Sequence, residues 1–264
     1  MNKIAVKKIA PALSSNDQDL SLNCFKASPH PSFKHTTYFD VYDELFKKFK
    51  NKPITFLEIG VLDGGSLFMW RKFFGKDARI IGVDLNPDAK KWEKYGFEIY
   101  IGSQSDPSFW ENINQKIGPV DIVLDDGGHT YVQQIVTVEK VLDNITEGGL
   151  LVVEDTHTSY MDGFGNKALS FINYVNIWIE RINSRFSDFA KSPGCNRVWS
   201  VEIFESIVAF KINHKASSVV SEQIWNRTRD EKNKSVDFRH DASEALKENE
   251  REIIKTLNQA FSLK

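Results

Sequence analysis

The sequence predicts an α/β fold in which helices cover both faces of a doubly wound, mostly parallel sheet. Short runs rich in Val, Ile and Leu, such as 120–124 and 150–153, are typical of strands buried on both faces. These runs alternate along the chain with segments of helical periodicity, at the spacing of βαβ units. Near the C-terminus, the alternating segments 197–204 and 207–212 predict an antiparallel hairpin.

The same patterns predict the order of the elements. Strands are expected at 54–59, 79–83, 97–101, 120–124 and 150–153. Helices are expected at 37–50, 67–74, 86–95, 107–117, 131–144, 167–189 and 242–261. The last helix is amphipathic and lies in a highly charged region, so it is expected on the surface or at a subunit contact.

The length and composition favour one main domain with appendages. The chain has 264 residues, of which 41% are hydrophobic, and this is enough to build one substantial core. We expect an N-terminal arm or lid at 1–32, a main domain at 33–213 and a charged helical tail at 214–264.

Charge and cysteine content exclude several classes of protein. A formal net charge of −2 gives no reason to expect a nucleic-acid partner. The two cysteines, Cys24 and Cys195, do not make a disulfide framework and fit a reducing compartment. No run is apolar enough for a membrane span, and Pro11 with the polar segment 14–17 interrupts any signal-peptide core. We therefore expect a soluble, cytoplasmic protein.

Two predicted strands each end in a pair of acids. Asp125 and Asp126 follow the strand at 120–124, and Glu154 and Asp155 follow the strand at 150–153. Ligands of parallel sheets bind beyond the carboxyl ends of the strands, so the acids are expected in one crevice. Carboxylates that lie so close repel one another unless a positive charge joins them. Oxygen ligands suit a hard divalent cation, which predicts a metal-assisted active site.

A glycine-rich turn follows the first predicted strand. Its glycines, Gly60, Gly64 and Gly65, lack the dinucleotide-binding spacing, and the chain has no P-loop. The acids Glu58 and Asp63 disfavour a pyrophosphate and suit a ligand with an amino group.

Later strand ends supply further candidate ligand contacts. Asp84 ends the second strand, where an acid binds ribose hydroxyls in nucleotide-binding folds. Ser103 and Gln104, after the third strand, are then expected to face the base.

The segment 57–66 resembles motif I of class I S-adenosylmethionine-dependent methyltransferases. Asp84 resembles their ribose-binding acid, and the C-terminal hairpin resembles the antiparallel pair that closes their seven-stranded, Rossmann-like sheet. This resemblance implies S-adenosylmethionine as a cofactor. The residues implied in binding it are Glu58, Gly60, Gly64, Ser66, Asp84, Ser103, Gln104 and Asp125.

A narrower resemblance rests on several motifs in order. These are Phe33-Lys34-His35-Thr36-Thr37-Tyr38, the segment from Glu58 to Trp70, Asp125-Asp126-Gly127-Gly128-His129, and Glu154-Asp155 with the loop Tyr160…Gly163-Phe164-Gly165. Over residues 33–212 they resemble the metal-dependent sugar O-methyltransferases of macrolide tailoring. Cephalosporin hydroxylase-like proteins share the general pattern.

This narrower resemblance implies an Mg²⁺ ion held by Asp126, Glu154 and Asp155. The ion orients a vicinal diol and lowers the pKa of the reacting hydroxyl. His129 is expected to act as the general base, with His157 as its rival, because an imidazole changes charge close to neutral pH.

Two further residues are expected near the transferred methyl group. His35 is expected to help hold the methionine end of the cofactor, and Tyr38 to lie near the sulfonium. The implied reaction transfers a methyl group to a hydroxyl of a sugar or glycosylated small molecule, in natural-product or polysaccharide biosynthesis. The family also suggests a homo-oligomer, a dimer or a tetramer.

Three alternatives stay open at this point. One is a hydroxylase-like enzyme of the same fold, because His129 and His157 permit a triad of two histidines and one carboxylate. Another is an O-methyltransferase of a catechol-like aromatic diol, which uses similar metal chemistry. The third is a non-catalytic protein that keeps the pocket for binding alone.

Overall fold

The structure is a computed structural model, and it describes residues 20–186, 197–222, 224–226 and 244–262. A seven-stranded sheet of order β3-β2-β1-β4-β5-β7-β6 forms its centre. The strands are β1 (Thr55–Ile59), β2 (Arg79–Asp84), β3 (Glu98–Ile101), β4 (Val120–Asp125), β5 (Ile145–Val153), β6 (Val198–Phe204) and β7 (Ile207–Ile212).

The pairing of the strands confirms the predicted fold. Strands β1 to β5 pair in parallel, whereas β7 pairs antiparallel with both β5 and β6. The chain leaves β1 toward β2 and β3 on one side, and then returns to the other side for β4 and β5. The strand order therefore reverses between β1 and β4, at the place where open α/β sheets bind ligands.

Helices follow most strands, in the predicted order. The α-helices are α1 (Ser21–Lys26), α2 (Tyr38–Phe46), α3 (Gly65–Phe74), α4 (Pro107–Ile117), α5 (Tyr131–Val141), α6 (Phe171–Asn183), α7 (His214–Ser217) and α8 (Glu244–Ser262). The 3₁₀ helices are η2 (Lys47–Phe49), η3 (Pro87–Tyr95), η4 (Leu142–Asn144), η5 (Thr156–Tyr160) and η6 (Lys167–Leu169).

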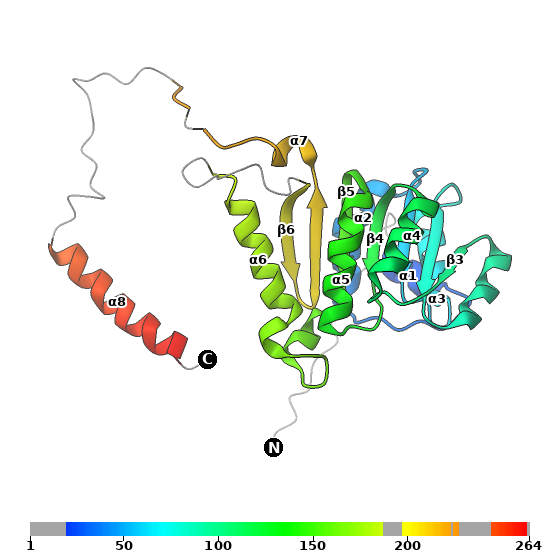
Figure 1. Cartoon of the computed structure of the whole chain (residues 1–264), viewed down its shortest axis with the longest axis horizontal. Coiled ribbons are helices and arrows are strands. Elements are labelled where there is room, and N and C mark those ends of the chain that lie inside the picture. Colours follow the sequence, from blue (N-terminus) through cyan, green and yellow to red (C-terminus); the bar gives the residue numbers. More distant parts are fainter. Residues whose placement is uncertain (1–19, 187–196, 223, 227–243, 263–264) are drawn as a thin grey trace. The chain divides into compact units, whose positions relative to one another are not determined.

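Both faces of the sheet are covered, because successive strand residues point to opposite sides. One core contains Phe56 and Ile122 of the strands, packed against aromatic residues of α2 and α3 such as Tyr42 and Trp70. The rings of Tyr42 and Trp70 meet edge to face, with their centroids 5.1 Å apart. The other core contains Val123 and Leu151, packed against α4, α5 and α6, which lie along one face of the sheet in Figure 1.

The largest differences from the predicted boundaries are in β5 and in the helix expected at 167–189. Strand β5 begins at Ile145 rather than at 150, because Ile145 pairs with Val120 before a register shift, after which Leu150 pairs with Ile122. The helix expected at 167–189 is divided, since Ser170 caps α6 through the backbone N–H of Asn173, and α6 ends at Asn183. Residues 187–189 lie outside the described part of the chain.

The chain divides into two units after Ser221. In the second unit, α8 is an amphipathic helix whose described side chains, including Ile253 and Leu257, are exposed. In the first unit, α1 precedes α2, and its Cys24 is buried in the core. None of the described helices combines the length and the apolar character that crossing a bilayer requires.

Candidate active site

A cavity of about 670 Å³ opens at the carboxyl ends of the central strands. It lies at the reversal of strand order, between the turn after β1 and the loop after β4. Its lining contains Asp63 of the glycine-rich turn and eight of the residues predicted to bind the cofactor, the metal or the substrate: Gly60, Ser66, Asp84, Ser103, Gln104, Asp126, His129 and Asp155.

The turn after β1 depends on glycine and on Asp84. Gly60 has φ +89°, and a Cβ placed there would lie 2.0 Å from the backbone oxygen of Asp126. One carboxylate oxygen of Asp84 accepts hydrogen bonds from the backbone N–H groups of Val61 and Leu62, at 2.8 and 3.1 Å. Asp84 therefore holds the turn in shape beside the cavity.

Glu58 lies beneath this turn and does not line the cavity. Its buried carboxylate accepts hydrogen bonds from the Ser66 hydroxyl at 2.8 Å and from the Trp70 indole N–H at 3.0 Å. Burial raises the pKa of Glu58 to about 7, although the nearby Lys34 ammonium opposes that rise. Gly64 also lies outside the lining and packs against the ring of Trp92.

Asp125 and Gln104 connect the ends of β3 and β4. The side-chain amide of Gln104 donates to both carboxylate oxygens of Asp125, at 2.9 and 3.1 Å. Its oxygen accepts from the backbone N–H of Gly128 at 2.8 Å. Asp125 is buried behind the cavity, and burial raises its pKa to about 6. This pair fixes the loop that carries Asp126 and His129.

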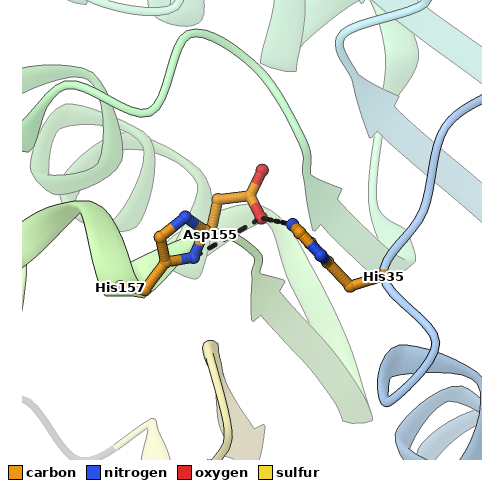
Figure 2. Close-up of side chains that lie close together, drawn as sticks. All are labelled: His35, Asp155 and His157. Carbon is orange, nitrogen blue, oxygen red and sulfur yellow. Dashed lines mark ion pairs between the residues drawn. The ribbon is translucent and has the colours of Figure 1, made fainter. Parts of the chain in front are cut away.

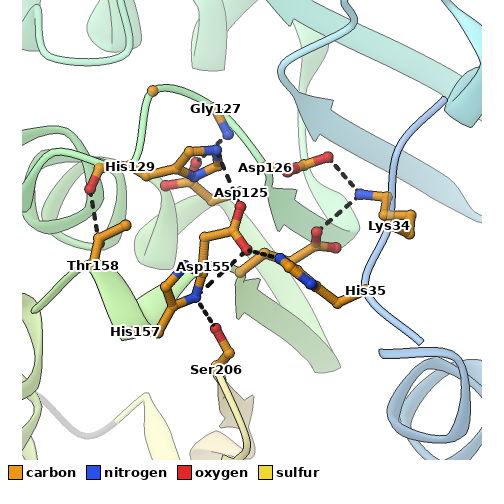
Figure 3. Close-up of polar contacts among 12 residues, drawn as sticks. Lys34, His35, Asp125, Asp126, Gly127, His129, Asp155, His157, Thr158 and Ser206 are labelled. Atoms are coloured by element: carbon orange, nitrogen blue, oxygen red, sulfur yellow. Dashed lines mark hydrogen bonds and ion pairs between the residues drawn. The ribbon is translucent and has the colours of Figure 1, made fainter. Parts of the chain in front are cut away.

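Lys34 joins Asp126 to Glu154. Its ammonium nitrogen lies 2.5 Å from a carboxylate oxygen of Asp126 and 2.9 Å from one of Glu154. Figure 3 shows the Lys34 side chain reaching across to Asp126 from the segment before α2. The Tyr42 hydroxyl donates to the other oxygen of Glu154 at 2.6 Å. Burial disfavours the charge of Lys34, but Asp126, Glu154 and Glu58 outweigh it and raise the pKa of Lys34.

The sequence motifs include Lys34 but predict no role for it, and they do not include Tyr42. The repulsion between the two acid pairs was the available signal. This repulsion predicted a positively charged partner, and a buried lysine can neutralise the carboxylates as a metal ion can. In this arrangement Glu154 bonds to Lys34 and Tyr42, so it would reach a cation only if the Lys34 ammonium moved.

Asp126, His129 and Asp155 form a cluster that could hold a metal. Their ligand atoms all lie within 4.8 Å of one another. The Nε2 atom of His129 is 3.2 Å from Asp155 Oδ2, whereas its Nδ1 atom is buried without a hydrogen-bond partner among the described residues. Both residues have left-handed backbones, with φ of +59° for His129 and +55° for Asp155. Strain of this kind is typical of functional sites.

His35 and Tyr38 lie beside this cluster and do not line the cavity. The Tyr38 hydroxyl donates to Asp155 Oδ1 and to Ser206 Oγ. His35 and His157 both approach the same Asp155 oxygen, each at 3.9 Å. Asp155 therefore lies between His129 on one side and His35 with His157 on the other.

The loop after β5 is anchored to α5. The Tyr131 hydroxyl donates to the backbone oxygens of Thr158 and Met161, at 3.1 and 3.0 Å. This loop was expected to contact a substrate, and its exposed Tyr160 lies next to the anchored stretch.

Comparisons with known proteins identify a family that part of the chain matches. Residues 57–156 match the family described as "Methyltransferase domain". The resemblance predicted from the sequence is thereby confirmed, and the matched region runs from β1 through both acid pairs.

Three curated relatives are O-methyltransferases by name, and one of these names specifies a rhamnosyl compound. A rhamnosyl tetracenomycin-C 2'-O-methyltransferase of Streptomyces olivaceus is 34% identical, over 48% of this chain and 35% of that protein. Mycinamicin VI 2''-O-methyltransferase of Micromonospora griseorubida is 35% identical, over 48% and 33%. Demethylmacrocin O-methyltransferase of Streptomyces fradiae is 34% identical, over 58% and 42%. This chain thus spans well under half the length of these relatives.

Among solved structures, the mycinamycin-pathway methyltransferase MycE in complex with Mg and SAH superposes with a TM-score of 0.67. The two are 27% identical, and the match covers 74% of this chain and 54% of MycE. A further MycE structure contains Mycinamycin VI as well, with the same TM-score and 26% identity.

Proposed function

We propose that this chain is an S-adenosylmethionine-dependent, Mg²⁺-assisted O-methyltransferase that acts on a hydroxyl of a sugar or glycosylated small molecule. The observation that carries the proposal is one cavity bordered both by the Gly60 turn and by Asp126, His129 and Asp155. The name of one curated relative, a rhamnosyl tetracenomycin-C 2'-O-methyltransferase, supports a sugar hydroxyl as the acceptor.

The cofactor is proposed to lie along the turn after β1. Asp84 and Gln104 line the cavity at successive strand ends, where the ribose and the base of a nucleoside bind in such folds. Ser66, at the start of α3, lines the cavity near the expected methionine end. The presence of SAH in the MycE complex supports this choice of cofactor.

The cation is proposed to bind Asp126 and Asp155, with Glu154 as the third ligand implied by the family. Bound Mg²⁺ supplies Lewis acidity that favours the alkoxide form of an acceptor hydroxyl. His129 would take the hydroxyl proton on Nε2, which lies 3.2 Å from Asp155 Oδ2. A cation bound to that carboxylate oxygen would leave the Nε2 lone pair free to accept the proton. The acceptor oxygen then forms a bond to the methyl carbon as the carbon–sulfur bond breaks, leaving S-adenosylhomocysteine.

His129→Gln is expected to lower kcat by on the order of a hundredfold, the usual contribution of a general base. The loss should be smallest at alkaline pH, where hydroxide can accept the proton. The measurement is the pH profile of kcat, from mildly acidic to alkaline conditions. Full activity across that range would exclude His129 as the base, and a parallel loss in His157→Gln alone would assign the role to its rival.

Asp84→Asn is expected to weaken S-adenosylmethionine binding by about tenfold or more, because a charged hydrogen bond contributes roughly 1.5–3 kcal/mol. The variant loses a charged acceptor for ribose hydroxyls and weakens the contacts to Val61 and Leu62. Calorimetry measures the affinity. Asp88→Asn is the control, since Asp88 also lines the cavity but lies in η3 rather than at the end of a strand. Equal affinity in both variants would contradict the assignment.

The proposed function is tested by incubating the chain with S-adenosylmethionine, Mg²⁺ and a panel of rhamnosides and other glycosides. Formation of S-adenosylhomocysteine together with a methylated glycoside supports it. Methylation of a catechol alone would favour the aromatic-diol alternative, and oxygen uptake without methyl transfer would favour the hydroxylase-like one. The proposal also includes a homo-oligomeric state and a cytoplasmic location. Light scattering measures the mass of the particle in solution and tests the first, and cell fractionation tests the second.

A further inference from the structure

Three side chains meet at the edge of the candidate active site. His35 comes from the segment before α2, whereas Asp155 and His157 come from the stretch after β5, and Figure 2 shows both imidazoles directed at one Asp155 oxygen. The distances from Asp155 Oδ1 to His35 Nε2 and to His157 Nδ1 are each 3.9 Å. The two imidazole rings are nearly perpendicular, at 88°, with centroids 5.8 Å apart.

These distances are slightly longer than those between ligands of a common metal ion. Zinc lies roughly 2.0–2.2 Å from its nitrogen and oxygen ligands and holds them tetrahedrally, which separates two of them by about 3.4 Å. The three ligand atoms here lie within 4.8 Å of one another, and small side-chain rotations would bring all three into coordination. Two imidazoles and one carboxylate favour borderline ions such as Zn²⁺, Co²⁺ or Fe²⁺ over Mg²⁺, which prefers oxygen ligands.

Asp155 has one oxygen for each of two ions. Its Oδ2 faces His129 and the Asp126 side of the cavity, whereas its Oδ1 faces His35 and His157. A carboxylate with this arrangement can bridge two cations, as in enzymes whose metals lie roughly 3.5–4 Å apart. The second position is therefore distinct from the one proposed for Mg²⁺.

The surroundings hold the ligands in place. Tyr38 donates to Asp155 Oδ1 and also to Ser206 Oγ, at 3.0 Å for the latter. Ser206, in the turn between β6 and β7, contacts His157 Nδ1. A cation would take the Nδ1 lone pair and release the Ser206 hydroxyl. The contact from Tyr38 to Asp155 would remain, and contacts of this kind orient the ligands of known metal sites.

Charge and access also favour a cation here. Within the described ranges, the ion-pair partners of Asp155 are His35, His129 and His157, with no lysine or arginine among them. The side chains of His35 and His157 are 48% and 43% exposed, so an ion can reach them from solvent.

We propose that His35, Asp155 and His157 form a second divalent-cation site, selective for a borderline transition ion and bridged by Asp155 to the proposed Mg²⁺ position. Such an ion would tie the segment before α2 to η5 beside the cavity.

The test is a Co²⁺ titration of the chelator-treated full chain in saturating Mg²⁺, followed through the visible absorption of Co²⁺. Wild type and His214→Gln, a histidine variant in α7, should each bind one Co²⁺ ion. His35→Gln and His157→Gln should each weaken that binding at least tenfold.

Unchanged affinity in both variants would overturn the second site, as would a signal removed only by His129→Gln. Circular dichroism identifies a variant that fails to fold. In that case, the NMR spectrum of the Co²⁺-bound wild type is used, and the imidazole groups with paramagnetically shifted signals are counted. Two such groups support the site, and the absence of any overturns it. Binding is measured without methyl transfer, so a chain that binds Co²⁺ through these residues but transfers no methyl group contradicts only the proposed function.

Discussion

Asp126→Asn is expected to lower kcat for methyl transfer by about a thousandfold or more, since a bound metal contributes several kcal/mol to the transition state. Asparagine keeps the shape of the side chain and the backbone contact with Gly60, but it removes the charge proposed to hold the cation. S-adenosylmethionine binding should stay largely intact. The measurements are single-turnover methyl transfer and calorimetric binding of S-adenosylmethionine and of Mg²⁺.

The control for this change is Asp143→Asn, which alters an acid that is 82% exposed in η4, outside the cavity lining. It should leave both activity and binding unchanged. If Asp126→Asn retained full activity while still binding the cofactor, Asp126 would have no part in metal-assisted catalysis.

Lys34→Met is expected to lower the free energy of unfolding by about 3–5 kcal/mol, the usual cost of removing one partner from a buried ion pair. The variant leaves Asp126 and Glu154 close together, with Glu154 fully buried and no ammonium between them. Urea unfolding in the presence of a chelator measures the loss.

Mg²⁺ should restore part of that loss, because a cation can replace the ammonium between the carboxylates. Lys76→Met is the control, since Lys76 is 92% exposed and should contribute little. Equal stability of the two variants in chelator would mean that Lys34 does not neutralise the acids.

The arrangement of strands was predictable because it depends on patterns that act locally. Uninterrupted apolar runs such as 120–124 identify central parallel strands, and the alternating segments near 204 and 207 identify the hairpin. The end of α6 at Asn183 was missed, because the apolar periodicity continues beyond the point where the helix ends. Its break at Ser170 depends on a capping hydrogen bond that residue spacing alone does not reveal.

The site was predictable where strand ends bring residues together. The turn at Gly60 and the acids at 125–126 follow from the topology of the sheet, and Gly60, Asp84 and Asp126 do line one cavity. The contact of Lys34 with Glu154 joins residues 120 positions apart, and periodicity carries no information about it. The same holds for the approach of His35 to Asp155, whereas its expected role in holding the cofactor stays a prediction.

The position of Asp126 couples two binding events. Its backbone N–H donates to the Ile59 oxygen at 3.0 Å, and its backbone oxygen lies against Gly60 in the turn proposed to hold the cofactor. Its carboxylate lies with His129 and Asp155 in the cluster that could hold a metal. A displacement of Asp126 changes both the turn at Gly60 and the proposed cation site. The affinity for the nucleoside and the affinity for the cation should therefore not be independent. Thermodynamic reciprocity then requires that each ligand alter the dissociation constant of the other by the same factor, whichever is added first.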